Sequence, residues 1–462
     1  MRVVDNRFER RRGKTIRGYL GMAGYAAAVL AVLSLVLPAA SFAQQTSPAI
    51  DADIHLGVAS CAGSTCHGSV EPWSKSTVLQ NEYITWQRED AHAKAYNVLL
   101  NDESKRIARN LGLPDAHTAE ACLTCHSDFV APDRQGTTFQ ITDGVGCEAC
   151  HGGSVRWIGV HLSGKGHELN VANGMYPSDD PVARAELCLS CHLGDESKFV
   201  THRIMGAGHP RMRFELDTFT ALQPAHFKVD DDYLERKKVY SGVQTWAIGQ
   251  AIAVKRLNSL LVNPERAYDG IFPELVFFDC HACHHPMSNK RWQPRIGTQL
   301  PPGIVRINDA NMIMLRIVAK HFDADLGGQL MKQTLALHAA STRGQDATVN
   351  AAKALQATAD QLVGLLSSRS FEASDIEALA VGIVEEGLAG EFADYAAAEQ
   401  ATMALASVIE TMDIAGLVDS QQREQMNTAI EACYKAVEKD EQYTPVAYVE
   451  CLNQFATTLP DF

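Results

Sequence analysis

Cys122-Leu-Thr-Cys125-His126 is the first of four segments in this chain that share one pattern, two cysteines separated by two residues and followed by a histidine. The other three are Cys147-Glu-Ala-Cys150-His151, Cys188-Leu-Ser-Cys191-His192 and Cys280-His-Ala-Cys283-His284. Two thiols at this spacing reach the two vinyl groups on one porphyrin edge, and the next residue turns back beneath the ring so that its imidazole meets the iron. A zinc site would leave each adjacent histidine unexplained. The pattern therefore predicts four covalently attached haems of the c type.

A fifth segment, Cys61-Ala-Gly-Ser-Thr-Cys66-His67, has two extra residues between its thiols. Gly63 and Ser64 are small and flexible, so the wider loop can still bring both sulfurs to a porphyrin edge. The alternative is a disulfide between Cys61 and Cys66, with His67 incidental. We favour haem attachment, which brings the expected total to about five haems.

Numbered in chain order, the five motifs begin at Cys61, Cys122, Cys147, Cys188 and Cys280. Shorter segments accompany the first four of these motifs in a recognisable order. They are Trp73, Asp90-Ala-His92-Ala-Lys94-Ala95, the run Asp143-Gly-Val-Gly before the third motif, and His161. Over about residues 59–193 the order of these segments and their residues resemble the cytochrome c-554 family of multihaem electron carriers. The resemblance implies a compact four-haem array and electron transfer alongside the oxidation of nitrogen compounds.

The same resemblance implies particular iron ligands. It places His92 on the iron held by His151, and His161 opposite His67. It implies an open face on the haem of His126, because the second haem of that family is five-coordinate, and a ligand from further downstream for the fourth haem. The chain departs from the family in its widened first motif, its extra motif at Cys280–His284 and its long carboxy-terminal region.

Three histidines after the fourth motif are candidates for the second ligands of the fourth and fifth haems: His202, His209 and His226. They lie in segments with turn-forming Gly and Pro residues. A second imidazole is the natural ligand for an electron carrier, because low-spin iron between two imidazoles changes little on reduction. We expect at least two of the three to bind iron.

The amino terminus reads as a targeting segment. A basic region is followed by an apolar run over about residues 19–37 and by the small-x-small site Ser41-Phe42-Ala43, which predicts a signal peptide over residues 1–43 and a periplasmic mature protein. The alternative is an uncleaved membrane anchor. Lys plus Arg total 41 against 55 Asp plus Glu, a net charge of −14. This balance argues against nucleic acid and suits redox partner proteins with basic surfaces.

We expect a mainly α protein in two parts, a multihaem domain over residues 44–300 and a helical domain over residues 301–462. Helices are predicted at 78–100, 103–111 and 243–263, with a further five or six in an up-and-down bundle after residue 301. Ser374-Asp-Ile-Glu377 is a predicted capping box, and Thr444-Pro445 a predicted helix start. Cys433 and Cys451, which have no adjacent histidine, are predicted to form a disulfide.

Electron transfer is the expected function, with catalysis left undecided. One alternative is a haem enzyme acting on a small nitrogen or sulfur species at a five-coordinate iron. Another is a structural subunit of a haem-containing assembly. The carboxy-terminal helices show no catalytic motif, so docking or homo-oligomer formation is expected of them, with a scaffold that shields the haems as the simpler alternative.

Overall fold

The computed structural model describes residue 50 and residues 52–285, 295, 300–301 and 304–459. These residues form helices joined by irregular segments, and they contain no β-strand, only isolated bridges between His55 and Gln135 and between Phe278 and Ile307. The prediction of a mainly α fold is confirmed. The predicted signal peptide and its cleavage site lie outside the described residues.

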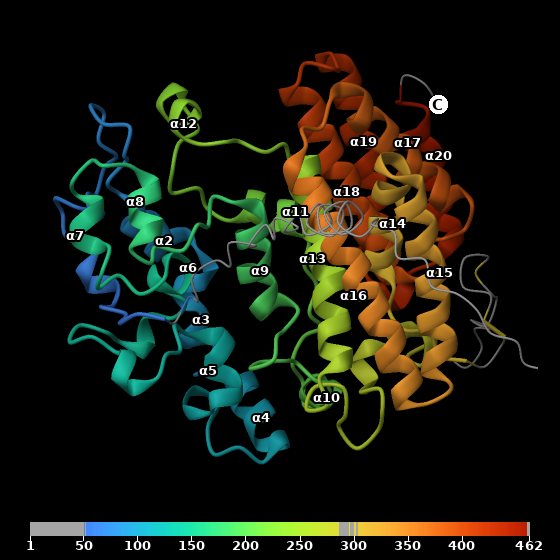
Figure 1. The fold of residues 1–462 in the computed structure, drawn as a ribbon, viewed down its shortest axis with the longest axis horizontal. Helices are drawn as coiled ribbons and strands as arrows, with labels where there is room; N and C mark the ends of the chain where they lie inside the picture. Colours follow the sequence, from blue (N-terminus) through green and yellow to red (C-terminus); the bar gives the residue numbers. More distant parts are fainter. Residues whose placement is uncertain (1–49, 51, 286–294, 296–299, 302–303, 460–462) are drawn as a thin grey trace, which may run out of the picture. The chain divides into compact units, whose positions relative to one another are not determined.

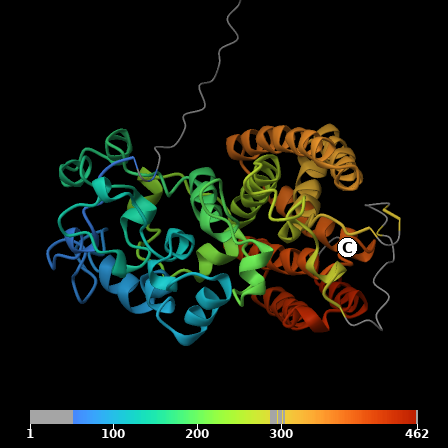
Figure 2. The same ribbon diagram turned by 90° about the horizontal axis from the view of Figure 1, so that it is seen from below.

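The part of the chain that carries the motifs is built from short helices separated by long turns, as Figure 2 shows. In chain order these are α2 (Glu82–Glu89), η2 (Ala91–Lys94), α3 (Ala95–Val98), α4 (Asp102–Leu111), α5 (Glu120–His126), α6 (Glu148–His151), α7 (Ile158–His161), α8 (His167–Ala172), α9 (Pro181–His192), α10 (His202–Gly206), α11 (Leu216–Leu222), α12 (Asp231–Arg236), η6 (Leu275–Phe277) and η7 (Cys280–Ala282). Each motif histidine from the second to the fourth is the last residue of its helix.

The single helix predicted over residues 78–100 is divided into three pieces. Asp90 has extended backbone angles, φ −78° and ψ 130°, and its side chain accepts the N–H of His92 at the start of η2. An aspartate that caps the next turn competes with continued helix, which is why the chain breaks there. The helices predicted at 103–111 and 243–263 correspond to α4 and α13 (Gly242–Val262).

Long helices form the bundle that Figure 1 shows around α13. After residue 304 the described chain has α14 (Ala310–Phe322), α15 (Ala324–Ser341), α16 (Gln345–Ser368), α17 (Ala373–Leu388), α18 (Tyr395–Ile414), α19 (Ser420–Ala436) and α20 (Pro445–Ala456). These are seven helices, more than the five or six predicted. No helix among the described residues is both long and apolar enough to cross a bilayer.

The bundle holds most of the apolar core. Its buried cluster runs through α13–α20 and includes Trp246, which is fully buried. The motif region contributes a second and much smaller cluster, formed by Tyr96, Leu99, Ala108, Ala116 and Leu123. Contacts group residues 47–462 together, and α13 packs against α16 although it precedes residue 300. The domain boundary at residue 300 stays a prediction.

Local predictions in the bundle had mixed outcomes. The capping box of α17 is formed by Glu372 and Asp375, whose carboxylate accepts the N–H of Glu372 at 2.8 Å. The prediction of Ser374 and Glu377 was therefore wrong by two residues. α20 begins at Pro445 after Thr444, as predicted. The disulfide between Cys433 and Cys451 is confirmed, with the Cα atoms 5.2 Å apart.

Candidate functional site

The histidine of every motif has a second histidine ring at nearly the same distance. The ring centres are 6.2 Å apart for His67 and His161, 6.4 Å for His126 and His209, 6.3 Å for His151 and His226, 6.2 Å for His192 and His92, and 6.0 Å for His284 and His202. Two imidazoles on one metal ion, with bonds of about 2 Å and ring centres just over 1 Å behind the nitrogens, have centres about 6 Å apart. Each pair is therefore separated by the space that one iron with two axial imidazoles needs.

Five of these ten rings are oriented through the nitrogen that faces away from the metal position. Nδ1 of His67 donates to Glu82 at 2.9 Å and Nδ1 of His92 donates to Asp90 at 2.9 Å. The other three donate to backbone carbonyls: His126 to Ala95, His161 to Ile158 and His209 to Pro210. A proton held on Nδ1 leaves the lone pair on Nε2, the arrangement that metal-binding histidines use.

Burial keeps two of the motif histidines neutral. It lowers the pKa of His151 to about 4, helped by His226, and it lowers the pKa of His192 to about 4, helped by His92. A metal binds the unprotonated imidazole, so these side chains are held in the form that coordinates.

The widened first motif keeps the backbone geometry of the strict motifs. The N–H of His151 donates to the carbonyl of Cys147 at 2.9 Å, and the N–H of His284 donates to that of Cys280 at 2.8 Å. In the first motif the N–H of His67 still reaches Cys61, at 3.2 Å. The two extra residues are taken up in a turn, so the histidine returns to the same place relative to the first cysteine.

All ten motif cysteines have free thiols in the structure. The disulfide between Cys61 and Cys66, the alternative for the first motif, is not formed. Cysteines of different motifs are neighbours in two places: Cys61 lies near Cys147, and Cys125 lies near Cys191. The first motif is therefore a neighbour of the third, and the second motif a neighbour of the fourth.

The pairing differs in part from what the family resemblance implied. His161 faces His67, as expected, but His92 faces His192 and not His151. The histidine facing His151 is His226, and Gln223, three residues before His226, donates to Asp90 at 2.9 Å.

The face expected to be open at the second motif has a histidine. His209 lies opposite His126, with ring planes at 81°. The three downstream candidates therefore serve the second, third and fifth motifs in this geometry, whereas we expected them at the fourth and fifth.

The fifth motif is attached to the bundle through ion pairs. Asp279, directly before Cys280, caps the N–H of His281 and pairs with Arg306 at 3.4 Å. Arg306 also pairs with Asp394, which precedes α18. These charges are nearly buried, and removing one partner of such a network is costly because the other charge is left unpaired. The bundle thus fixes the position of the fifth motif.

A buried group of potential metal ligands beneath the third motif is fully engaged in hydrogen bonds. Nδ1 of His55 contacts Asp128 at 2.8 Å, and Nε2 contacts the carbonyl of Ile50 at 3.1 Å. The carboxylate of Glu148 accepts the N–H groups of residues 56, 57 and 154 at 2.6–2.8 Å. Both His55 nitrogens are occupied, so the group supports the backbone around Cys147–His151.

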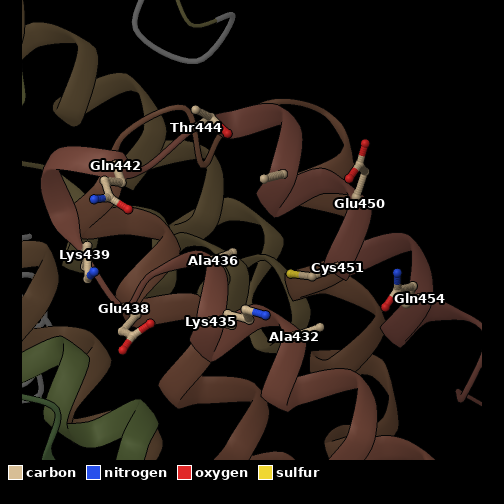
Figure 3. A pocket seen from close by; sticks show the side chains of 11 residues that line it. Ala432, Lys435, Ala436, Glu438, Lys439, Gln442, Thr444, Glu450, Cys451 and Gln454 are labelled. Atoms are coloured by element: carbon tan, nitrogen blue, oxygen red, sulfur yellow. The ribbon is translucent and has the colours of Figure 1, made fainter. Parts of the chain in front are cut away.

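The orienting carboxylates Glu82 and Asp90 were not predicted. Asp90 stands two residues before His92, a spacing at which an aspartate can bond both the backbone and the ring of the histidine, and this signal was present in the sequence. Glu82 is 15 residues from His67, which no local pattern would reveal. A surface hollow beside Cys451, shown in Figure 3, includes none of the paired histidines.

Two thiols, a following histidine and a second imidazole across the metal position define the protein as a c-type cytochrome with bound haem iron. Comparison with protein families agrees, because residues 60–152 match the family described as cytochrome c554 and c-prime. The matched segment, which contains the first three motifs, is similar to that family. No curated protein and no solved structure matched the chain.

Proposed function

We propose that this protein is a periplasmic electron carrier with five c-type haems, each between two histidines. The observation that carries the proposal is the set of five histidine pairs with ring centres 6.0–6.4 Å apart. When bound, each haem supplies an iron that accepts or releases one electron. The proximal ligands are His67, His126, His151, His192 and His284, and the opposite ligands are His161, His209, His226, His92 and His202.

The chain's own residues suit electron transfer because they hold each imidazole still. Hydrogen bonds at Nδ1 fix the rings of His67 and His92 to carboxylates and those of three others to carbonyls. A ring that is already oriented moves little when the charge of the metal changes. The paired cysteines would keep the haems attached in both oxidation states.

We favour electron transfer over catalysis because, among the described residues, a second histidine faces the histidine of every motif. A haem enzyme needs an iron with a free face, and the expected candidate was the second motif. There His209 stands opposite His126, its own Nδ1 bonded to the carbonyl of Pro210 at 2.8 Å. The proposal therefore places two protein ligands at all five sites and no substrate on iron.

The partner that fits best is a redox protein with a basic surface, because the chain carries a net charge of −14 and opposite potentials steer association. Nucleic acid does not suit such a charge. On the described part of α14–α20 the large exposed apolar side chains are Ile414, Tyr434 and Val446. These three residues lie on three different helices, and the bundle's proposed role is to scaffold the fifth motif.

The test is the haem content and spin state of the protein purified from the periplasmic fraction. We expect a denatured mass equal to residues 44–462 plus five haems, and a resting ferric EPR spectrum with low-spin iron alone. Fewer than five haems, or a colourless protein after acidified acetone, would contradict the proposal. High-spin iron that binds nitric oxide would favour the enzyme instead.

A further inference from the structure

One short segment, residues 201–210, carries the opposite ligands of two different motifs. His202 begins α10 and faces His284 of the fifth motif, with ring centres 6.0 Å apart. His209 follows the end of the same helix and faces His126 of the second motif, at 6.4 Å. A displacement of this segment would therefore move a histidine at both sites.

The end of the segment that carries His209 is held against α4. Nδ2 of Asn110, in α4, donates to the carbonyl of Ala207 at 2.9 Å. Gly208 has a φ of +122°, which favours glycine, and a Cβ there would lie 3.3 Å from Ile107. The position of His209 is thus set by α4 and a glycine turn.

The end of the segment that carries His202 is held by Arg203, which donates to the carbonyl of Leu111 in α4 at 3.3 Å, and by one buried carboxylate, that of Glu274. Its Oε1 accepts the backbone N–H of His202 at 2.8 Å, and its Oε2 accepts the N–H of Val276 at 2.7 Å. Val276 belongs to η6, which leads directly into the fifth motif. Glu274 is 2 % exposed, so water does not compete for these two bonds. One buried side chain therefore joins the helix of His202 to the segment that presents His284.

We infer that Glu274 is the positioning residue of the fifth haem site, holding His202 opposite His284. The inference rests on the proposed function, since it concerns ligands of a proposed haem. Glu274 touches neither imidazole ring. It acts through the first backbone N–H of α10 and through η6, and the second site is spared because α4 holds His209.

The test compares Glu274→Gln and Glu274→Ala with a matched control, Glu215→Gln. Glu215 is also 2 % exposed, and it accepts two backbone N–H groups, both at 2.8 Å, at the start of α11, a helix without a paired histidine. The readouts are the high-spin signal in EPR and the stoichiometry of carbon monoxide binding to the reduced protein. The full haem-loaded chain is used throughout.

We expect the unsubstituted protein and Glu215→Gln to bind no carbon monoxide. Glu274→Ala should bind up to one molecule per chain, with Glu274→Gln in between because its amide oxygen keeps one acceptor. Loss of an orienting partner weakens metal ligation by about 10–100-fold. His202→Ala should bind one molecule, and adding Glu274→Ala to it should change nothing further.

Glu274 variants that keep five low-spin haems and bind no carbon monoxide would overturn the inference while leaving the proposed function intact. An equal response in Glu215→Gln would also overturn it, because the effect would then be a general loss of helix capping. The haem count of the unsubstituted chain is measured first, by mass. A count below five there would be a failure of the proposed function, visible before any variant is compared.

Discussion

Asp90 accepts two hydrogen bonds from His92, one from its backbone N–H and one from its Nδ1–H, both at 2.9 Å. The carboxylate is 4 % exposed and also accepts from Gln223. A buried carboxylate on Nδ1 makes the imidazole a stronger donor through Nε2, which favours the ferric state of a bound iron. The pair therefore sets the direction of His92 and, with His92 on iron as proposed, would set the electron affinity of that site.

Asp90→Asn should raise the midpoint potential of one haem. A tenfold loss of preference for the ferric state corresponds to about 60 mV for a one-electron couple. The measurement is a spectroelectrochemical titration, in which the midpoint potentials of four haems should stay unchanged and that of one haem should rise. Glu82→Gln is the matched variant at His67, where it should move a different component. A titration curve unchanged by Asp90→Asn would contradict the role of this carboxylate.

His92→Ala should leave the iron of the fourth motif without its second ligand. The pairing with His192, rather than with His151, makes this prediction specific. In the full chain we expect one high-spin haem by EPR. In a chain that also carries Cys188→Ala and Cys191→Ala, and so lacks the fourth haem, His92→Ala should add no high-spin signal.

The matching experiment removes the third haem through Cys147→Ala and Cys150→Ala. In that background His92→Ala should still produce one high-spin haem. The reverse pattern, with the signal lost only when the third motif is removed, would show that His92 serves His151 as the family resemblance implied.

Covalent chemistry made the proximal half of each site predictable from the sequence. The distance between two thiols and the next histidine is set within five residues, or seven in the first motif, so a local pattern suffices. The rest of the fold adds little to this local pattern: the N–H of His67 still donates to the carbonyl of Cys61 despite two extra residues. The disulfide between Cys433 and Cys451 was predictable for a similar reason, because no other cysteines remained.

The opposite half of each site depends on contacts between distant residues. His226 faces His151 from a distant part of the chain, and nearby Gln223 is bound to Asp90, 133 residues earlier. His202 is held by Glu274, 72 residues later. No periodicity or spacing encodes such contacts. Of the two partners that the family resemblance assigned, His161 faces the motif histidine expected of it, and His92 faces another. The break at Asp90 was missed because its neighbours have ordinary helical composition.

Removing the disulfide with Cys433→Ala and Cys451→Ala should lower the free energy of unfolding by about 3 kcal/mol, the loop-closure estimate for 18 residues. Urea titration followed by far-UV circular dichroism measures the change. Haem content and EPR spectrum should not change, since the two cysteines lie in α19 and α20 and are not motif residues. Asp440, in the loop that the disulfide closes, lies 4.0 Å from His281, so the fifth motif is the one to watch. A loss below about 1 kcal/mol would show that the closed loop contributes little.

Glu215 should make stability depend on pH between its unfolded and folded pKa values. Burial, with a smaller contribution from Asp217, raises its pKa from 4.5 to about 7, and Tyr434 is the other titratable side chain facing it. Between these values the folded chain holds a proton that the unfolded chain has lost. The free energy of unfolding therefore falls as pH rises from 4.5 to 7, by up to about 3 kcal/mol.

Glu215→Gln replaces the titrating carboxyl group with an amide. It should therefore remove the pH dependence of the unfolding free energy that Glu215 causes. The difference in unfolding free energy between variant and unsubstituted protein, from urea titrations at several pH values, should rise in favour of the variant from pH 5 to pH 8. The absolute offset includes about 1 kcal/mol for a weaker helix cap, so the slope is the informative quantity. Glu424→Gln, on the exposed face of α19, should give a flat difference. A flat difference for Glu215→Gln as well would mean that Glu215 is ionised throughout, with its charge stabilised by the N–H groups of Asp217 and Thr218.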